Sequence, residues 1–90
     1  LVPIELSLHQ NYPNPFNPQT TITWSMPLSG IVSLEVYNLQ GQLMEHLFDG
    51  YKEVGMHEQV WDASAYPSGI YFYRLMTNEK TLQKVMLLLK

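Results

Sequence analysis

The sequence predicts an all-β protein, an antiparallel sandwich of about seven strands. Three observations lead to this prediction. Apolar and polar residues alternate with a period of two in most segments, as they do in strands that cover a core with one face. Turn signals built from glycine, proline and asparagine recur about every 8 to 12 residues. No segment is periodic enough to supply the crossover helices that a parallel sheet requires.

Length and composition predict one folded domain spanning residues 1–90. Hydrophobic residues make up 46% of the chain and charged residues 14%, which is typical of a packed body and not of a disordered tail. The chain has no cysteine, so we expect neither disulfides nor thiolate metal sites. It opens on Leu1 and not on methionine, which suggests a fragment of a longer protein.

Charge and hydropathy exclude several classes of function. The net charge is -3 and the basic residues do not cluster, so nucleic acid is a poor candidate partner. No apolar run approaches the roughly 18 residues of a membrane span. Residues 1–10 lack the basic flank and unbroken apolar stretch of a signal peptide. If the protein is exported, its targeting signal does not lie in residues 1–10.

The first half of the chain is expected to hold four strands interrupted by a proline block. Residues 1–9 alternate, with Ile4, Leu6 and Leu8 on one side, and are predicted to form the first strand. The block at residues 11–18 contains three prolines, which exclude helix and central strand there. The apolar sets of the next two strands, at residues 20–26 and 31–37, are Ile22, Trp24 and Met26, then Val32, Leu34 and Val36.

Residues 42–48 are ambiguous. Leu43, Met44, Leu47 and Phe48 fit helical spacing as well as a bulged strand, but seven residues between turn signals are short for a helix. A strand is therefore predicted there.

The second half is expected to hold three strands. A polar loop bracketed by Asp49-Gly50 and Gly55 precedes a strand at residues 56–62. The most β-like segment follows at residues 70–76, and a tight connection at 78–80 leads to the last strand, residues 81–89.

The last strand has apolar residues on both faces. Either Val85, Leu87 and Leu89 fill the core while Met86 and Leu88 are tolerated outside, or a partner strand covers the edge. The residues alone leave both alternatives open.

The polar residues predict no catalytic or metal centre. His9, His46 and His57 fall in three different predicted strands, and a triad or zinc site would need them brought together in a cleft. Asp62 could join Asn14 or Asn17 as a calcium ligand, but no dense acidic loop is present. We expect Asp62 to cap a turn instead, and we expect no cofactor.

Eight aromatic residues could form either the core or a sugar-stacking platform. Tyr71 and Tyr73 share one face of their predicted strand and Ile70 and Phe72 the other, so one pair could be exposed. A core role is favoured, because a small domain without cross-links needs large buried side chains. The eight residues are Tyr12, Phe16, Trp24, Trp61, Tyr66, Tyr71, Phe72 and Tyr73.

These residues resemble the C-terminal sorting domain, type A, of proteins exported by the bacterial type IX, or Por, secretion system. The resemblance covers nearly the entire chain, and its motifs arrive in the family's order. They are Leu8 with Asn11-Tyr12-Pro13-Asn14-Pro15-Phe16-Asn17-Pro18, Thr20-Thr21-Ile22, Val36-Tyr37-Asn38, Gly41-Gln42, Gly55-Met56-His57, Trp61-Asp62-Ala63, Ser68-Gly69-Ile70-Tyr71-Phe72-Tyr73-Arg74-Leu75, and Lys84-Val85-Met86-Leu87-Leu88-Leu89-Lys90.

The resemblance implies an antiparallel immunoglobulin-like β-sandwich, similar to a domain of the flagellar hook-capping protein, and no enzyme. It implies a sorting signal at the end of a larger parent protein, which passes through the periplasm and across the outer membrane and is then secreted or held at the cell surface. The implied partners are the outer-membrane translocon and a sortase-like peptidase. The last segment, Lys84 through Lys90, is the part that the machinery is thought to need.

Two alternatives remain beside this interpretation. A carbohydrate-binding accessory module of a secreted hydrolase predicts an exposed, ring-lined patch, and a passive spacer predicts no binding at all. A homodimer through the last strand is also compatible with the sequence. Trp24 and Met26 stand where the family often has tyrosine and leucine, which are conservative departures.

Overall fold

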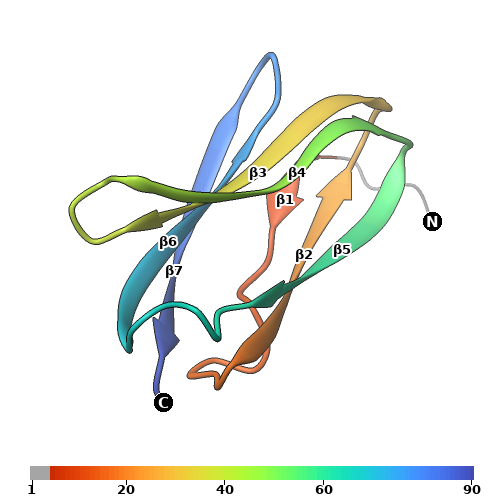
Figure 1. The fold of residues 1–90 in the computed structure, drawn as a ribbon. Coiled ribbons are helices and arrows are strands. Elements are labelled where there is room, and N and C mark those ends of the chain that lie inside the picture. The colour runs from red at the N-terminus through yellow and green to blue at the C-terminus, as the bar shows by residue number, and fades with distance from the viewer. Residues whose placement is uncertain (1–4) are drawn as a thin grey trace.

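A computed structural model, which describes residues 5–90, confirms the antiparallel all-β fold (Figure 1). Within that range seven strands form two sheets, with the orders β1-β2-β5 and β4-β3-β6-β7, and every pairing of neighbours is antiparallel. Their distribution is compatible with an immunoglobulin-like connectivity. The strands are β1 (Ser7–Leu8), β2 (Gln19–Met26), β3 (Gly30–Asn38), β4 (Leu43–Lys52), β5 (Gly55–Asp62), β6 (Gly69–Met76) and β7 (Thr81–Leu88).

The core lies between the two sheets and is built by alternation. Ile22, Trp24 and Met26 of β2 are buried, and so is the predicted apolar set of β3. These predictions are confirmed. Each such side chain contributes roughly 1.5–3 kcal/mol by leaving water. The buried apolar residues are Leu8, Phe16, Ile22, Trp24, Met26, Val32, Leu34, Val36, Trp61, Ala63, Tyr71, Tyr73, Leu75, Met86 and Leu88.

The fourth strand is longer than predicted. The expected polar loop from Asp49 is wrong, because β4 continues to Lys52, which pairs with Gly30. Leu34 pairs with Phe48 and Glu35 with His46, so Leu47 is an extra residue in a β-bulge. The bulge explains the helical spacing of the apolar residues, since it lets Leu47 and Phe48 both pack against the core.

The first strand is shorter than predicted. Residues 1–4, including Ile4, lie outside the described residues, and β1 covers only Ser7 and Leu8. Leu8 is buried and Leu6 packs against the core, as their alternation predicted.

The last strand turns the opposite face inward. Met86 and Leu88 are fully buried, whereas Val85 and Leu89 are 47% and 51% exposed, so the alternative in which the odd-numbered residues fill the core is excluded. The register with β6 decides the outcome: Met86 lies opposite the buried Tyr71. A shift of one residue would reverse every side chain, and a segment that is apolar on both faces cannot reveal its register by pattern.

Candidate functional site

Three segments that are distant in the sequence meet at one end of the sandwich. Figure 1 shows the connection between β1 and β2, the connection between β5 and β6, and the end of β7 at the same end of the molecule. We call residues 11–18 the proline block, and this end of the sandwich the C-terminal pole. All three X-Pro bonds of the block are cis.

The proline block pairs with the end of β7. The Phe16 amide donates to the Leu87 carbonyl at 3.0 Å, and the Leu89 amide donates to the Phe16 carbonyl at 3.0 Å. The side-chain oxygen of Asn14 accepts from the Leu87 amide at 3.0 Å, and the Gln10 amide group donates to the Val85 carbonyl at 2.7 Å. The chain therefore closes its own edge between Val85 and Leu89. A partner strand or a second copy would have to displace these bonds to pair there.

Asn11 fastens the start of the block to both sheets. Its side chain is 2% exposed and donates to the Thr20 hydroxyl at 3.0 Å and to the Pro13 carbonyl at 3.2 Å. Its backbone amide donates to the Tyr73 hydroxyl at 2.8 Å, which in turn donates to the His9 carbonyl at 2.6 Å. Burial raises the pKa of Tyr73 to about 12. The phenol therefore stays neutral and holds both backbone groups.

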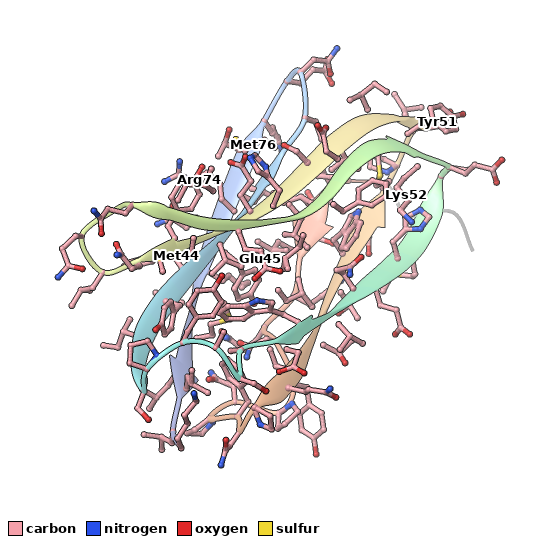
Figure 2. All side chains as sticks on the ribbon, in the orientation of Figure 1. Met44, Glu45, Tyr51, Lys52, Arg74 and Met76 are labelled. Atoms are coloured by element: carbon pink, nitrogen blue, oxygen red, sulfur yellow. The ribbon has the colours of Figure 1, made fainter. Side chains whose placement is uncertain are left out.

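An aromatic cluster packs beneath the block. The ring centroids of Phe16 and Trp61 are 5.8 Å apart, and those of Trp61 and Tyr71 are 5.7 Å apart with the rings edge-to-face. Glu45, labelled in Figure 2, reaches from β4 toward β5, and its Oε1 accepts from the Trp61 indole at 3.0 Å and from the Tyr66 hydroxyl at 3.1 Å. These contacts join the block to the core.

The turn after β5 is capped by Asp62. Its Oδ1 accepts hydrogen bonds from the Ser64 amide at 2.9 Å and from the Ser64 hydroxyl. These bonds, with a smaller contribution from Gln19, hold the pKa of Asp62 below its ordinary value. Lys90 reaches the same connection, since its amide donates to the Ser68 hydroxyl at 2.9 Å and its ammonium to the Ser64 carbonyl at 2.7 Å.

The matched region of a known family coincides with this closure. A family model described as the secretion system C-terminal sorting domain matches residues 10–88. Those limits run from Gln10, which bonds to β7, to Leu88 at the end of β7. The chain belongs to this family. It is a C-terminal sorting signal for type IX secretion, acting as part of a larger parent that is exported across the outer membrane. No curated protein matches the chain.

The three histidines of the sorting domain serve separate local contacts. His9 contacts the Ser25 hydroxyl at 3.3 Å, His46 contacts Glu35 at 2.8 Å, and His57 contacts a backbone carbonyl at 2.6 Å. In residues 5–90 no group of three histidine, aspartate or glutamate side chains is placed to hold a metal ion. Nor does that part of the chain contain a helix long and apolar enough to cross a membrane.

The aromatic residues of the sorting domain lie mostly inside it. Of the eight named above only Tyr12, at 81%, is largely exposed, while Tyr66 and Phe72 are half-buried. On β6 the tyrosines point inward, and Ile70, at 43%, is the more exposed residue of the outer pair. These eight residues thus do not form the exposed platform of rings that stacking a sugar would need.

The predicted recognition segment divides between the two faces. Val85, Leu87 and Leu89 are accessible, Met86 and Leu88 are buried, Lys84 is half-buried opposite Tyr73, and Lys90 is exposed. The other motif residues gather near the pole, where Trp61, Asp62, Gly69 and Tyr71 form or flank the connection from β5 to β6. Gly41 lies apart, at a positive φ in the turn between β3 and β4.

Sequence reasoning missed Gln10, Glu45 and Tyr73 as contributors to this site. Each acts through a contact between residues far apart in the chain, such as the bond from Gln10 to Val85. No local pattern marks such a partner. The adjacency of Gln10 to the proline block was the one available signal.

Proposed function

We propose that the outward side of Lys84 through Lys90 carries recognition by the outer-membrane translocon. The proline block holds this segment in a fixed position. The observation that carries the proposal is the closed edge: Phe16 and Asn14 form hydrogen bonds with the backbone groups of Leu87 and Leu89. The translocon therefore recognises side chains of this segment and not unpaired backbone groups. The accessible side chains there are Val85, Leu87, Leu89 and Lys90.

The test changes outward side chains and leaves the core intact. A reporter enzyme fused ahead of the domain is expressed in a host with a type IX system, and its activity is measured in the medium and on the cell surface. The double variant Val85→Asn, Leu89→Asn is expected to reduce export about tenfold, the effect of losing a binding anchor. Met86 and Leu88 are unchanged, so the fold is retained.

Val60→Asn is the matched control, because Val60 is 52% exposed on the opposite sheet. It is expected to leave export at the level of the unmodified domain. Undiminished export of the double variant, with an unchanged unfolding temperature, would refute recognition through this segment.

We also infer that a sortase-like peptidase removes the domain after transport, releasing the parent or attaching it to the surface. Family membership supports this inference. An immunoblot of the exported reporter should show a product shortened by the mass of the domain. An exported reporter that keeps the whole domain would contradict it.

A further inference from the structure

An uncharged apolar band crosses the outer face of the second sheet. Strand pairing places Leu87 opposite Ile70, Val85 opposite Phe72, and Tyr37 opposite both Phe72 and Leu43. Residues that are directly paired share a face, so these side chains are contiguous on the side away from the core. The apolar band comprises Tyr37, Leu39, Leu43, Ile70, Phe72, Val85 and Leu87, with Leu39 60%, Leu43 46%, Ile70 43% and Val85 47% exposed.

The charged groups beside the band each have a local partner: Glu35 pairs with His46, and Arg74 contacts the neutral side chains of Tyr37 and Gln83. The His46 ring lies 2.8 Å from the Glu35 carboxylate, which also accepts a hydrogen bond from the Tyr37 hydroxyl at 2.5 Å. The Arg74 guanidinium stacks 4.2 Å from the centre of the Tyr37 ring and bonds Gln83 at 3.1 Å. The band itself contains no charged residue, so an apolar partner surface could cover it without burying an unpaired charge.

The band ends on a rigid turn that projects Leu39. The side-chain oxygen of Asn38 accepts from the amides of Gln40 at 3.0 Å and Gln42 at 2.9 Å, and its amide group donates to the Gln42 side chain at 2.7 Å. Figure 1 shows this β3–β4 hairpin extending beyond the rest of the sandwich. A turn that is already ordered loses little conformational entropy on binding.

A hollow lies between this turn and the C-terminal pole. Its volume is about 260 Å³, and its apolar lining includes Leu39, Met44, Pro67 and Ile70. Tyr71 and Ser68 complete the side toward the pole, where Ser68 also holds the amide of Lys90. The hollow therefore connects the β3–β4 turn with the end of β7.

The outer face of the first sheet differs. On β2 its outward residues are Thr21, Thr23 and Ser25, and on β5 the exposed Met56 and Val60 are separated by Glu58. Polar residues interrupt the apolar ones throughout. An extended apolar surface is thus a property of the second sheet and not of both faces.

We propose that the apolar band is the surface on which this sorting domain docks, and that its occupant is an apolar groove of an outer-membrane translocon component. This inference rests on the proposed function and extends it beyond the last strand. Val85 and Leu87 already belong to the proposed recognition segment, so the band continues that surface onto β6 and the β3–β4 turn.

The closed edge of β7 and the composition of the band favour this occupant over two others. A second copy could extend the sheet at β7 only by displacing the bonds from Gln10, Asn14 and Phe16, so a strand-paired dimer is disfavoured. An anionic membrane selects clusters of lysine and arginine, and the band contains neither.

The test uses the reporter fusion with changes outside the last strand. The double variant Leu39→Asn, Ile70→Asn is expected to reduce export about tenfold while the unfolding temperature stays unchanged. Ile31→Asn is the matched control, since Ile31 is 65% exposed and faces outward at the far end of β3. A photo-crosslinking amino acid at position 39 is expected to trap a translocon subunit, identified by mass spectrometry and missing from a translocon-deficient strain.

The outcomes separate the two proposals. Suppose that Leu39→Asn, Ile70→Asn is fully exported and Val85→Asn, Leu89→Asn is not. That result would overturn docking through the apolar band and would leave recognition through Lys84 to Lys90 supported. If both double variants are exported fully, both proposals fail. A stable dimer of the purified chain that Leu39→Asn, Ile70→Asn abolishes would make the occupant a second copy, and would also overturn the inference.

Discussion

At the scale of single residues, Tyr73 links the proline block to the second sheet. Its hydroxyl donates to the His9 carbonyl at 2.6 Å and accepts from the Asn11 amide at 2.8 Å, and the side chain is fully buried. One phenol thus satisfies two backbone groups, the amide of the buried Asn11 and the carbonyl of the half-buried His9. A buried polar group that loses its hydrogen-bond partner lowers the free energy of unfolding, so the Tyr73 hydroxyl contributes to the stability of the fold.

Tyr73→Phe is expected to destabilise the domain by about 2 kcal/mol, because the buried Asn11 amide and the half-buried His9 carbonyl each lose their partner. For a chain of this length that corresponds to a fall of roughly 8–16 °C in unfolding temperature. Thermal unfolding followed by circular dichroism measures it. The exposed Tyr12→Phe serves as the control, and equal unfolding temperatures for both variants would contradict the role given to Tyr73.

The pH dependence of stability follows from the same side chain. Burial raises the pKa of Tyr73 from 10.0 to about 12, so the unfolded chain loses this proton at a lower pH than the folded chain. Its contribution is complete below pH 10 and is lost as the pH rises to about 12. Urea unfolding across this range should show stability falling less steeply in Tyr73→Phe than in the unmodified domain, and equal slopes would count against the assignment.

Residue by residue, alternation predicted the buried faces of β2 and β3 and left the buried face of β7 open. Ile22, Trp24 and Met26 alternate with polar residues, so their inward direction was visible. Met86 and Leu88 lie among other apolar residues, and only pairing with β6 selects their face. The partner of the Tyr73 hydroxyl was likewise invisible, because it lies 64 residues away.

At the scale of elements, the proline block acts as a short edge piece for β7. Phe16 forms a parallel bridge with Leu88, and Asn14 accepts from Leu87. The block therefore covers the edge that would otherwise be open to aggregation or strand exchange. Proline is compatible with this position, because the hydrogen bonds to β7 come from the Phe16 backbone and the Asn14 side chain and not from the prolines.

The three asparagines of the block are expected to differ in importance. Asn11→Ala should cost about 1–3 kcal/mol, because Asn11 is buried and its side chain satisfies Thr20 and Pro13. Asn17→Ala is the control, since Asn17 is exposed and makes no side-chain bond within residues 5–90. Chemical denaturation of both variants measures the difference. Equal midpoints would show that the buried amide has no structural role.

The elements were predicted well in number and less well in length. Turn signals locate the seven strands, but Asp49-Gly50 predicts the start of a loop, whereas the edge strand β4 continues through these residues. The bulge at Leu47 spaces the apolar residues of β4 unevenly, which is why they also fit helical spacing. The block itself is recognisable from its prolines. Its pairing with β7 is not predictable, because no periodic pattern of residues marks where one segment will pair with a strand edge.

At the scale of the whole molecule, motifs from both ends of the sorting domain converge at one pole. Gln10 and Val85 are 75 residues apart in sequence and joined by a hydrogen bond. The proline block, the Asp62 turn and the last strand thus form one structural unit at the C-terminal pole. Each of these segments supplies contacts to another, such as the pairing of Phe16 with Leu87 and Leu89 and the bond from Lys90 to the Ser64 carbonyl. The apolar band then extends from this pole toward the β3–β4 turn.

The central claim is that these 90 residues suffice as a type IX sorting signal. The most direct measurement is the export of a reporter enzyme fused ahead of the chain, scored in the medium and on the cell surface of a type IX host and of a translocon-deficient strain. We expect activity outside the first strain and periplasmic retention in the second. Retention of a folded fusion in both strains would contradict the claim.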